Sequence, residues 1–143
     1  MNIFAIESSC DDTAAAIVKD GRKIISCKTF SQIEKHKIYG GVVPEVASRN
    51  HIEAVVPITQ SVLEESGLTW SDIDALAVTY APGLVGSLLV GVNFVKGLSL
   101  STGLLIIPVP HGFGESFVFG ALVPVGGFIK ASDLKGKERL GAV

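Results

Sequence analysis

Acidic and hydroxyl side chains gather near the N-terminus, between the first apolar run and the second. The cluster holds three carboxylates and three hydroxyls, those of Glu7, Ser8, Ser9, Asp11, Asp12 and Thr13. Such a group could coordinate a hard cation, hydrogen-bond a phosphate, or orient a nucleophile. Asp and Ser also favour turns through hydrogen bonds to the local backbone, so a solvated turn is the alternative.

A second stretch with possible chemistry follows residues 75–80, an apolar run typical of a buried strand. Pro82 and Gly83 break the strand, Gly86 loosens the backbone, and Ser87 is placed to cap a helix. A glycine-bearing turn between a strand and a helix N-terminus can hold an anion on free N–H groups. The alternative is a plain strand–turn–helix unit whose glycines serve packing only.

Composition places the 143-residue chain among globular proteins, because 48% of its residues are hydrophobic and 18% are charged. A formal net charge of −2 argues against an autonomous nucleic-acid binder, which is usually basic. Two cysteines are too few for a disulfide framework and favour the cytoplasm. Charged and polar residues interrupt the apolar runs, so we expect neither a secretory signal nor a segment that spans a bilayer.

The order of apolar runs and turns predicts an α/β architecture with a mixed sheet. Three strands come first in hairpin order, since Asp20-Gly21 is a strong hairpin signal. A helix then begins near Pro44, is kinked or split by Pro57, and ends at Gly67. A strand, a helix closed by Gly103 and a further strand complete the pattern. The expected strands are 2–8, 13–18, 23–29, 74–80 and 104–109, and the expected helices are 44–67 and 87–102.

The expected helix 44–67 could pack on a partner subunit as readily as on its own sheet, because polar residues lie among small ones partway along it. His51 is one of these polar residues. We expect it to be a structural histidine with satisfied hydrogen bonds rather than a ligand.

Three long motifs occur together and in one order: IESSCDDT at 6–13, YGGVVPEVASRNH at 39–51 and APGLVGSLLVG at 81–91. Together they resemble the N-terminal half of the tRNA threonylcarbamoyladenosine transferases (TsaD), formerly called O-sialoglycoprotein endopeptidases or glycoproteases. The resemblance runs from Asn2 to about His111 without a gap. It implies an actin-, Hsp70- and sugar-kinase-like (ribonuclease H-like) lobe, one of two in the family.

The resemblance also implies a reaction and a site. The family transfers a threonylcarbamoyl group from its adenylate to N6 of the adenosine beside the anticodon in certain tRNAs. The adenylate lies between the lobes, and a divalent iron or zinc ion is held by a His-x-x-x-His pair and an aspartate of the second lobe. Carried onto this chain, the resemblance makes Asp11 and Asp12 the catalytic residues and His111 a metal ligand. The residues implied for the adenine nucleotide or threonylcarbamoyl-adenylate are Ser9, Thr13, Gly83 and Gly86.

The chain departs from the family pattern after His111. Glu115 stands where the second metal-binding histidine is expected, and a carboxylate binds such ions with different geometry. The rest is rich in glycine and matches no family motif, so we divide the chain into an actin-like lobe, 1–110, and a divergent tail, 111–143. One hypothesis is a shift of reading frame just after His111; the rival hypothesis is a natural one-lobe relative.

Three functional interpretations follow. The first is the N-terminal lobe of the transferase, inactive alone and reaching tRNA through an assembled complex without a membrane. The second is a non-catalytic scaffold that binds itself or a TsaB-like partner through residues 44–67, since a lone lobe exposes surface that another lobe would bury. The third, suggested only by the old family label, is a metalloprotease; it ranks last because the sequence has no His-Glu-x-x-His motif.

Overall fold

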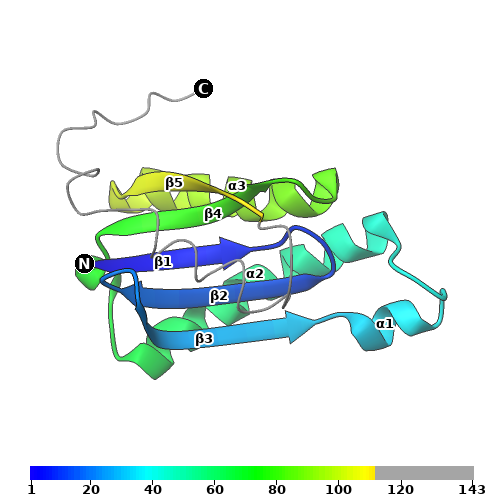
Figure 1. Cartoon of the computed structure of the whole chain (residues 1–143), viewed down its shortest axis with the longest axis horizontal. Helices are drawn as coiled ribbons and strands as arrows, with labels where there is room; N and C mark the ends of the chain where they lie inside the picture. Colours follow the sequence, from blue (N-terminus) through cyan, green and yellow to red (C-terminus); the bar gives the residue numbers. More distant parts are fainter. Residues whose placement is uncertain (112–143) are drawn as a thin grey trace.

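A five-stranded mixed sheet forms the frame of the computed structural model, which describes residues 1–111 (Figure 1). The strand order is β3-β2-β1-β4-β5. The first three strands, β1 (Asn2–Glu7), β2 (Asp12–Lys19) and β3 (Lys23–Ser31), form the predicted antiparallel meander. Asp20 and Gly21 turn the chain between β2 and β3 with φ of 51° and 68°, the left-handed conformations that a tight hairpin requires.

The second half of the sheet is parallel. β4 (Ala75–Ala81) pairs with β1, and β5 (Leu105–Pro110) pairs with β4. Parallel neighbours need a crossover connection, and α3 (Val85–Thr102) supplies it between β4 and β5. A short helix α1 (Ile33–Lys37), the long helix α2 (Pro44–Ser66) and a 3-10 turn η1 (Trp70–Asp72) connect β3 to β4.

Helix α2 is continuous, so the predicted split at Pro57 is wrong. The proline side chain is exposed, while Val55, Ile58 and Val62 are buried on either side of it. This buried face keeps the helix in one piece although Pro57 cannot donate a backbone hydrogen bond. Gly67 ends the helix in the left-handed conformation, with φ of 68°, as predicted.

Helix α3 begins earlier than predicted. Leu84 is its N-cap, and Ser87 lies inside the first turn with a fully buried side chain. The carbonyl of Ser87 accepts a hydrogen bond of 2.8 Å from the Ser8 hydroxyl of the neighbouring turn. Contact with another element therefore decides the position of Ser87, and the prediction that it caps the helix is wrong. Gly103 ends α3 as predicted.

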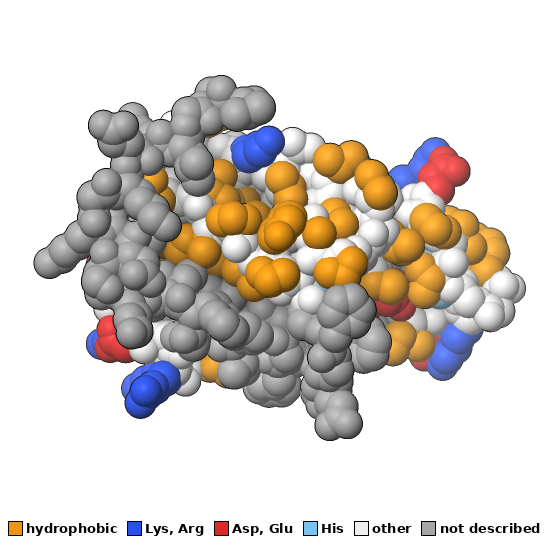
Figure 2. Space-filling view, turned by 45° about the horizontal axis from the view of Figure 1, so that its top comes forward, with side chains coloured by type: hydrophobic (Ala, Val, Ile, Leu, Met, Phe, Trp, Pro, Cys, Tyr) orange, Lys and Arg blue, Asp and Glu red, His pale blue; other side chains and the backbone are white. Residues whose placement is uncertain are grey.

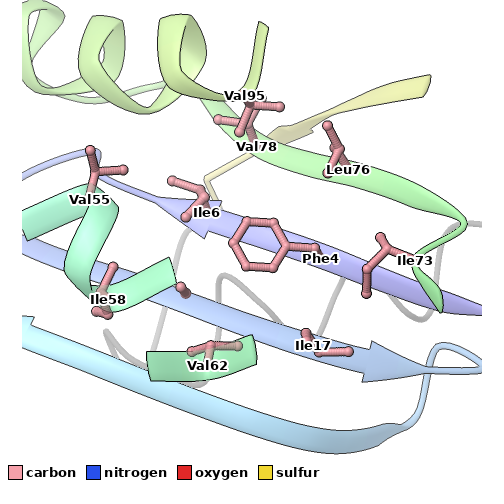
Figure 3. Close-up of a cluster of buried hydrophobic side chains, with 11 residues drawn as sticks. Phe4, Ile6, Ile17, Val55, Ile58, Val62, Ile73, Leu76, Val78 and Val95 are labelled. Carbon is pink, nitrogen blue, oxygen red and sulfur yellow. The ribbon is translucent and has the colours of Figure 1, made fainter. Parts of the chain in front are cut away.

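Both long helices lie on the same face of the sheet, behind it in Figure 1. Alternate strand residues face them: Phe4 and Ile6 of β1 join Val55 and Ile58 of α2 and Val95 of α3 in one cluster (Figure 3). The Phe4 ring meets Trp70 edge to face, with centroids 5.1 Å apart. The opposite face of the sheet is lined by smaller side chains, among them Ala5, Ala14, Ala16 and Ala77.

Helix α3 is long and apolar enough to cross a membrane by length and composition alone. In the structure, α3 packs on β4 and α2 as a helix that covers a sheet. Its exposed hydrophobic residues are Val85, Leu89 and Leu100. Figure 2, in which the top of Figure 1 comes forward, shows hydrophobic side chains gathered on the side where α3 and β5 lie.

Candidate functional site

The acidic cluster forms the turn between β1 and β2. Strand β1 ends at Glu7 and β2 begins at Asp12, so four residues reverse the chain. Oε1 of Glu7 accepts a hydrogen bond from the backbone N–H of Ser9, which ties the end of the strand to the turn. The Ser8 hydroxyl is buried and also accepts the N–H of Gly91 at 3.2 Å, so α3 packs directly on this turn.

The glycine turn after β4 docks on the acidic turn. The N–H of Leu84 donates to the carbonyl of Ser9 at 2.7 Å. A Cβ atom on Gly83 would come within 2.5 Å of the same carbonyl oxygen, so only glycine allows this approach. Gly83 thus has a packing role here, whether or not the turn also binds a ligand.

His51 of α2 holds the other side of the acidic turn. Its Nε2 lies 3.0 Å from the carbonyl oxygen of Cys10, and its Nδ1 lies 2.7 Å from Oγ1 of Thr13. Because a carbonyl only accepts, Nε2 carries the proton, and the Thr13 hydroxyl donates to Nδ1. Burial lowers the pKa of His51, so the ring is neutral at neutral pH. The prediction of a satisfied structural histidine is confirmed.

A cavity of about 20 Å³ opens beside the turn and is lined by Glu7, Ser9, Cys10, Asp11, Asp12 and His111. This volume has room for a single water molecule or a small ion, so a larger ligand would extend beyond it. The cavity lies where the carboxyl ends of the parallel strands meet, since Glu7 ends β1 and His111 follows β5. The N–H of His111 donates to the carbonyl of Ala81 at 2.7 Å, which fixes the end of β5 beside β4.

Two buried carboxylate oxygens in this region, Oε2 of Glu7 and Oδ1 of Asp12, have no hydrogen-bond partner among the described residues. Oε2 of Glu7 lies 3.7 Å from Nδ1 of His111, and the Ser9 hydroxyl lies 3.3 Å from the same nitrogen. Buried charged oxygens without partners are costly, so such an arrangement is typical of a site that receives a positively charged or proton-donating group.

Cys10 does not supply a thiolate to this site at neutral pH. Burial, together with a hydrogen bond and charge repulsion from Asp11, raises the pKa of the Cys10 thiol to about 11. The protonated thiol is a poor nucleophile and a poor metal ligand. Cys10 is therefore part of the cavity wall.

The structure brings together four of the predicted site residues, Ser9, Asp11, Asp12 and His111, around one cavity. Thr13 is fully buried and bonds to His51, and neither Gly83 nor Gly86 lines the cavity. Gly86 lies against the Ser48 side chain of α2. Glu115 lies outside the described residues.

Two cavity residues, Cys10 and Glu7, were not predicted as site residues from the sequence, and Glu7 is the one that brings a carboxylate. A charged residue as the last member of a buried apolar strand is the signal that could have distinguished it from the turn residues.

The described residues do not hold a complete metal site, because residues 1–111 contain no group of three His, Cys, Asp or Glu side chains placed to bind one ion. His111 fits as one ligand: its ring lines the cavity, and its Nδ1 faces Glu7 and Ser9.

Comparison with known proteins identifies a family. A family model described as "tRNA N6-adenosine threonylcarbamoyltransferase" matches residues 23–115. A relative of that description from Fusobacterium nucleatum is 56% identical over 117 residues, which are 82% of this chain and 34% of the relative. Another from Lactobacillus gasseri is 54% identical over 115 residues, 80% of this chain and 33% of the relative. The chain therefore spans about a third of the length of these relatives.

A solved structure shows the same fold. YeaZ from Pseudomonas aeruginosa superposes with a TM-score of 0.56 at 19% sequence identity, over 77% of this chain and 44% of that chain. The predicted fold class, an actin-like lobe with a mixed sheet, is confirmed, and so is the resemblance drawn from the three motifs.

Replacing Gly83 with alanine tests the contact between the two turns. We expect Gly83→Ala to lower the free energy of unfolding by about 1–3 kcal/mol, because the new Cβ meets a backbone atom that cannot rotate away. Gly86→Ala is the control: its Cβ meets the Ser48 hydroxyl, which can rotate, and alanine favours a helix by about 1 kcal/mol. Denaturant unfolding of both variants measures the difference, and equal losses would contradict the packing role of Gly83.

Acid should weaken the fold through His51. In the unfolded chain a histidine binds a proton near pH 6.5, whereas burial holds the pKa of His51 below that value, against the opposing charges of Glu7, Asp11 and Asp12. The stabilisation is therefore present above about pH 6.5 and is lost as the pH falls through the folded-state pKa. We expect the stability difference between the wild type and His51→Gln to narrow between pH 8 and pH 5.5 in denaturant unfolding. A constant difference would show that His51 titrates normally.

Proposed function

Since the chain belongs to the tRNA N6-adenosine threonylcarbamoyltransferase family, we propose that it is the N-terminal lobe of such an enzyme. The enzyme moves a threonylcarbamoyl group from its adenylate to N6 of the adenosine next to the anticodon in tRNA, in the cytoplasm. The proposal rests on the match of residues 23–115 to the family model, in a chain that covers only 34% of its Fusobacterium relative. The lobe alone is inactive in this proposal.

The size of the cavity supports inactivity of the isolated lobe. A space of about 20 Å³ accepts one water molecule or ion, so an adenylate must be enclosed largely by residues beyond 1–111. Ser9 would contribute to the adenylate site from this lobe. Thr13 and the glycine turn, with Gly83 and Gly86, would hold the turn that carries Ser9 in position. The described lobe thus supplies one wall of the site.

Asp11 and Asp12 have the proposed catalytic role. Their carboxylates line the cavity, and carboxylates repel a phosphate unless a cation lies between them. We therefore assign them to holding a cation or its water ligands beside the phosphate. A divalent iron or zinc ion, when bound, would polarise the carbonyl group that the adenosine amino group attacks, and His111 would be one of its ligands.

The second candidate function, a scaffold subunit, is favoured by an exposed apolar surface on the two helices. Ile52 and Val56 of α2 are 63% and 48% exposed, and Val85 and Leu89 of α3 are 73% and 52% exposed. Each pair is spaced by four residues and so lies on one helix face. Gly86 contacts the Ser48 side chain, so α2 and α3 lie against each other near these residues. A second copy of the chain or a TsaB-like subunit would bury this surface.

Transfer activity tests the first function. We expect the chain alone to modify tRNA no faster than a blank when threonylcarbamoyl-adenylate is supplied. A chimera that joins residues 1–111 to the remaining part of the Fusobacterium nucleatum relative should be active, and Asp11→Asn in the chimera should lower the rate by at least about 100-fold, the scale of a lost electrostatic contact in a transition state. Modified nucleoside is measured by mass spectrometry after tRNA digestion. A folded but inactive chimera would contradict the proposal.

A charged substitution on the exposed face of α2 tests association through the helices. We expect Ile52→Asp to shift the chain from a dimer, or from a complex with a TsaB-like subunit, to a monomer, because a carboxylate in a buried apolar interface is costly. Leu100→Asp is the control, since Leu100 is 85% exposed and lies about 16 Å further along α3 than Leu89. Light scattering over a range of concentrations gives the mass. Equal masses for the two variants would show that the interface does not lie at Ile52.

A further inference from the structure

We propose that Glu7 is a positioning residue for His111: its buried carboxylate keeps the imidazole proton on Nδ1 and leaves Nε2 as the free electron-pair donor at the cavity. The tautomer follows from the geometry of this lobe. The use of Nε2 as a ligand atom or base rests on the proposed function.

The Glu7 carboxylate is nearly enclosed, with 8% of its side chain exposed. Oε1 is occupied by the backbone N–H of Ser9, so the orientation of the group is fixed from the turn. Oε2 has no hydrogen-bond donor among the described residues, and it lies 3.7 Å from Nδ1 of His111. The one partner that the lobe directs toward this oxygen is therefore the imidazole ring.

The charge of Glu7 decides which ring nitrogen carries the proton. The Ser9 hydroxyl, 3.3 Å from Nδ1, can donate or accept and does not distinguish the two forms. A carboxylate only accepts. With the proton on Nε2, the Nδ1 lone pair would face the negative Oε2; with the proton on Nδ1, an N–H bond faces it instead.

The resulting arrangement suits a metal ligand or a general base. Histidines that bind metals commonly donate the other ring N–H to a carboxylate, which fixes the ring and raises the basicity of the ligating nitrogen. A cavity with room for one water molecule or ion lies beside the ring. Glu7 thereby acts on the site through His111 and does not need to touch the substrate.

The other two histidines in the sequence have the opposite tautomer and serve as internal references. Nδ1 of His36 accepts the N–H of Val43 at 3.4 Å, and its Nε2 lies 3.1 Å from Oε1 of Gln32, so its proton is on Nε2. His51 carries its proton on Nε2 as well, because the carbonyl of Cys10 accepts it.

Long-range ¹H–¹⁵N correlation of the ¹⁵N-labelled full chain at about pH 9, where neutral imidazole predominates, tests the assignment. We expect two histidines with the Nε2–H pattern and one, His111, with the Nδ1–H pattern. Glu7→Gln should convert His111 to Nε2–H, because the introduced side-chain amide would place an N–H donor opposite Nδ1. His36 and His51 should keep their patterns, which reports that the variant is folded.

Ser9→Ala separates the two neighbours of the ring. It removes the hydroxyl and keeps the carboxylate, so His111 should retain Nδ1–H. The proposal is overturned if wild-type His111 carries its proton on Nε2, if Glu7→Gln leaves the tautomer unchanged, or if Ser9→Ala alone reverses it. A chimera without transfer activity would contradict the proposed function but would not change the tautomer of His111. Failure of the proposed function and failure of the tautomer proposal are therefore distinguishable.

Discussion

The backbone of the turn between β1 and β2 depends on hydrogen bonds from other elements. The Ser9 carbonyl is bonded by the Leu84 N–H at the start of α3, and the Cys10 carbonyl is bonded by the His51 ring of α2. Buried carbonyl groups need partners, so the turn keeps this shape only while both helices are docked on the sheet. The position of the carboxylates is thus a consequence of the tertiary packing of 1–111.

Sheet topology explains why distant residues meet at this turn. Strand β1 lies between β2 and β4, and β4 and β5 run parallel to it, so the residues that follow these strands share one edge of the sheet. Ligands of open α/β sheets bind at such carboxyl ends. The close approach of Gly83 to Ser9 then closes the gap between two neighbouring strand ends.

Local rules predicted the parts of the fold that local residues determine. The hairpin at Asp20-Gly21 and the helix ends at Gly67 and Gly103 follow from backbone conformation, and all three were predicted from the sequence. Ser87 satisfied the capping rule and was still misplaced, because its carbonyl is bonded by Ser8 from a distant part of the chain. The approach of Glu7 to His111 could not be predicted for the same reason. No periodicity in the sequence relates strand β1, which ends at Glu7, to the residue that follows strand β5.

The charges of the cavity restrict what it can bind. Glu7, Asp11 and Asp12 line it, and the described lining residues include neither Lys nor Arg. A phosphate group approaching this wall meets carboxylates in a partly dry environment, where like charges repel more strongly than in water. An anionic ligand can therefore lie here only if a cation or a protonated imidazole accompanies it. The charges of the acidic turn consequently favour a cation, and the turn would face a phosphate, as in the proposed function, only together with such a positive group.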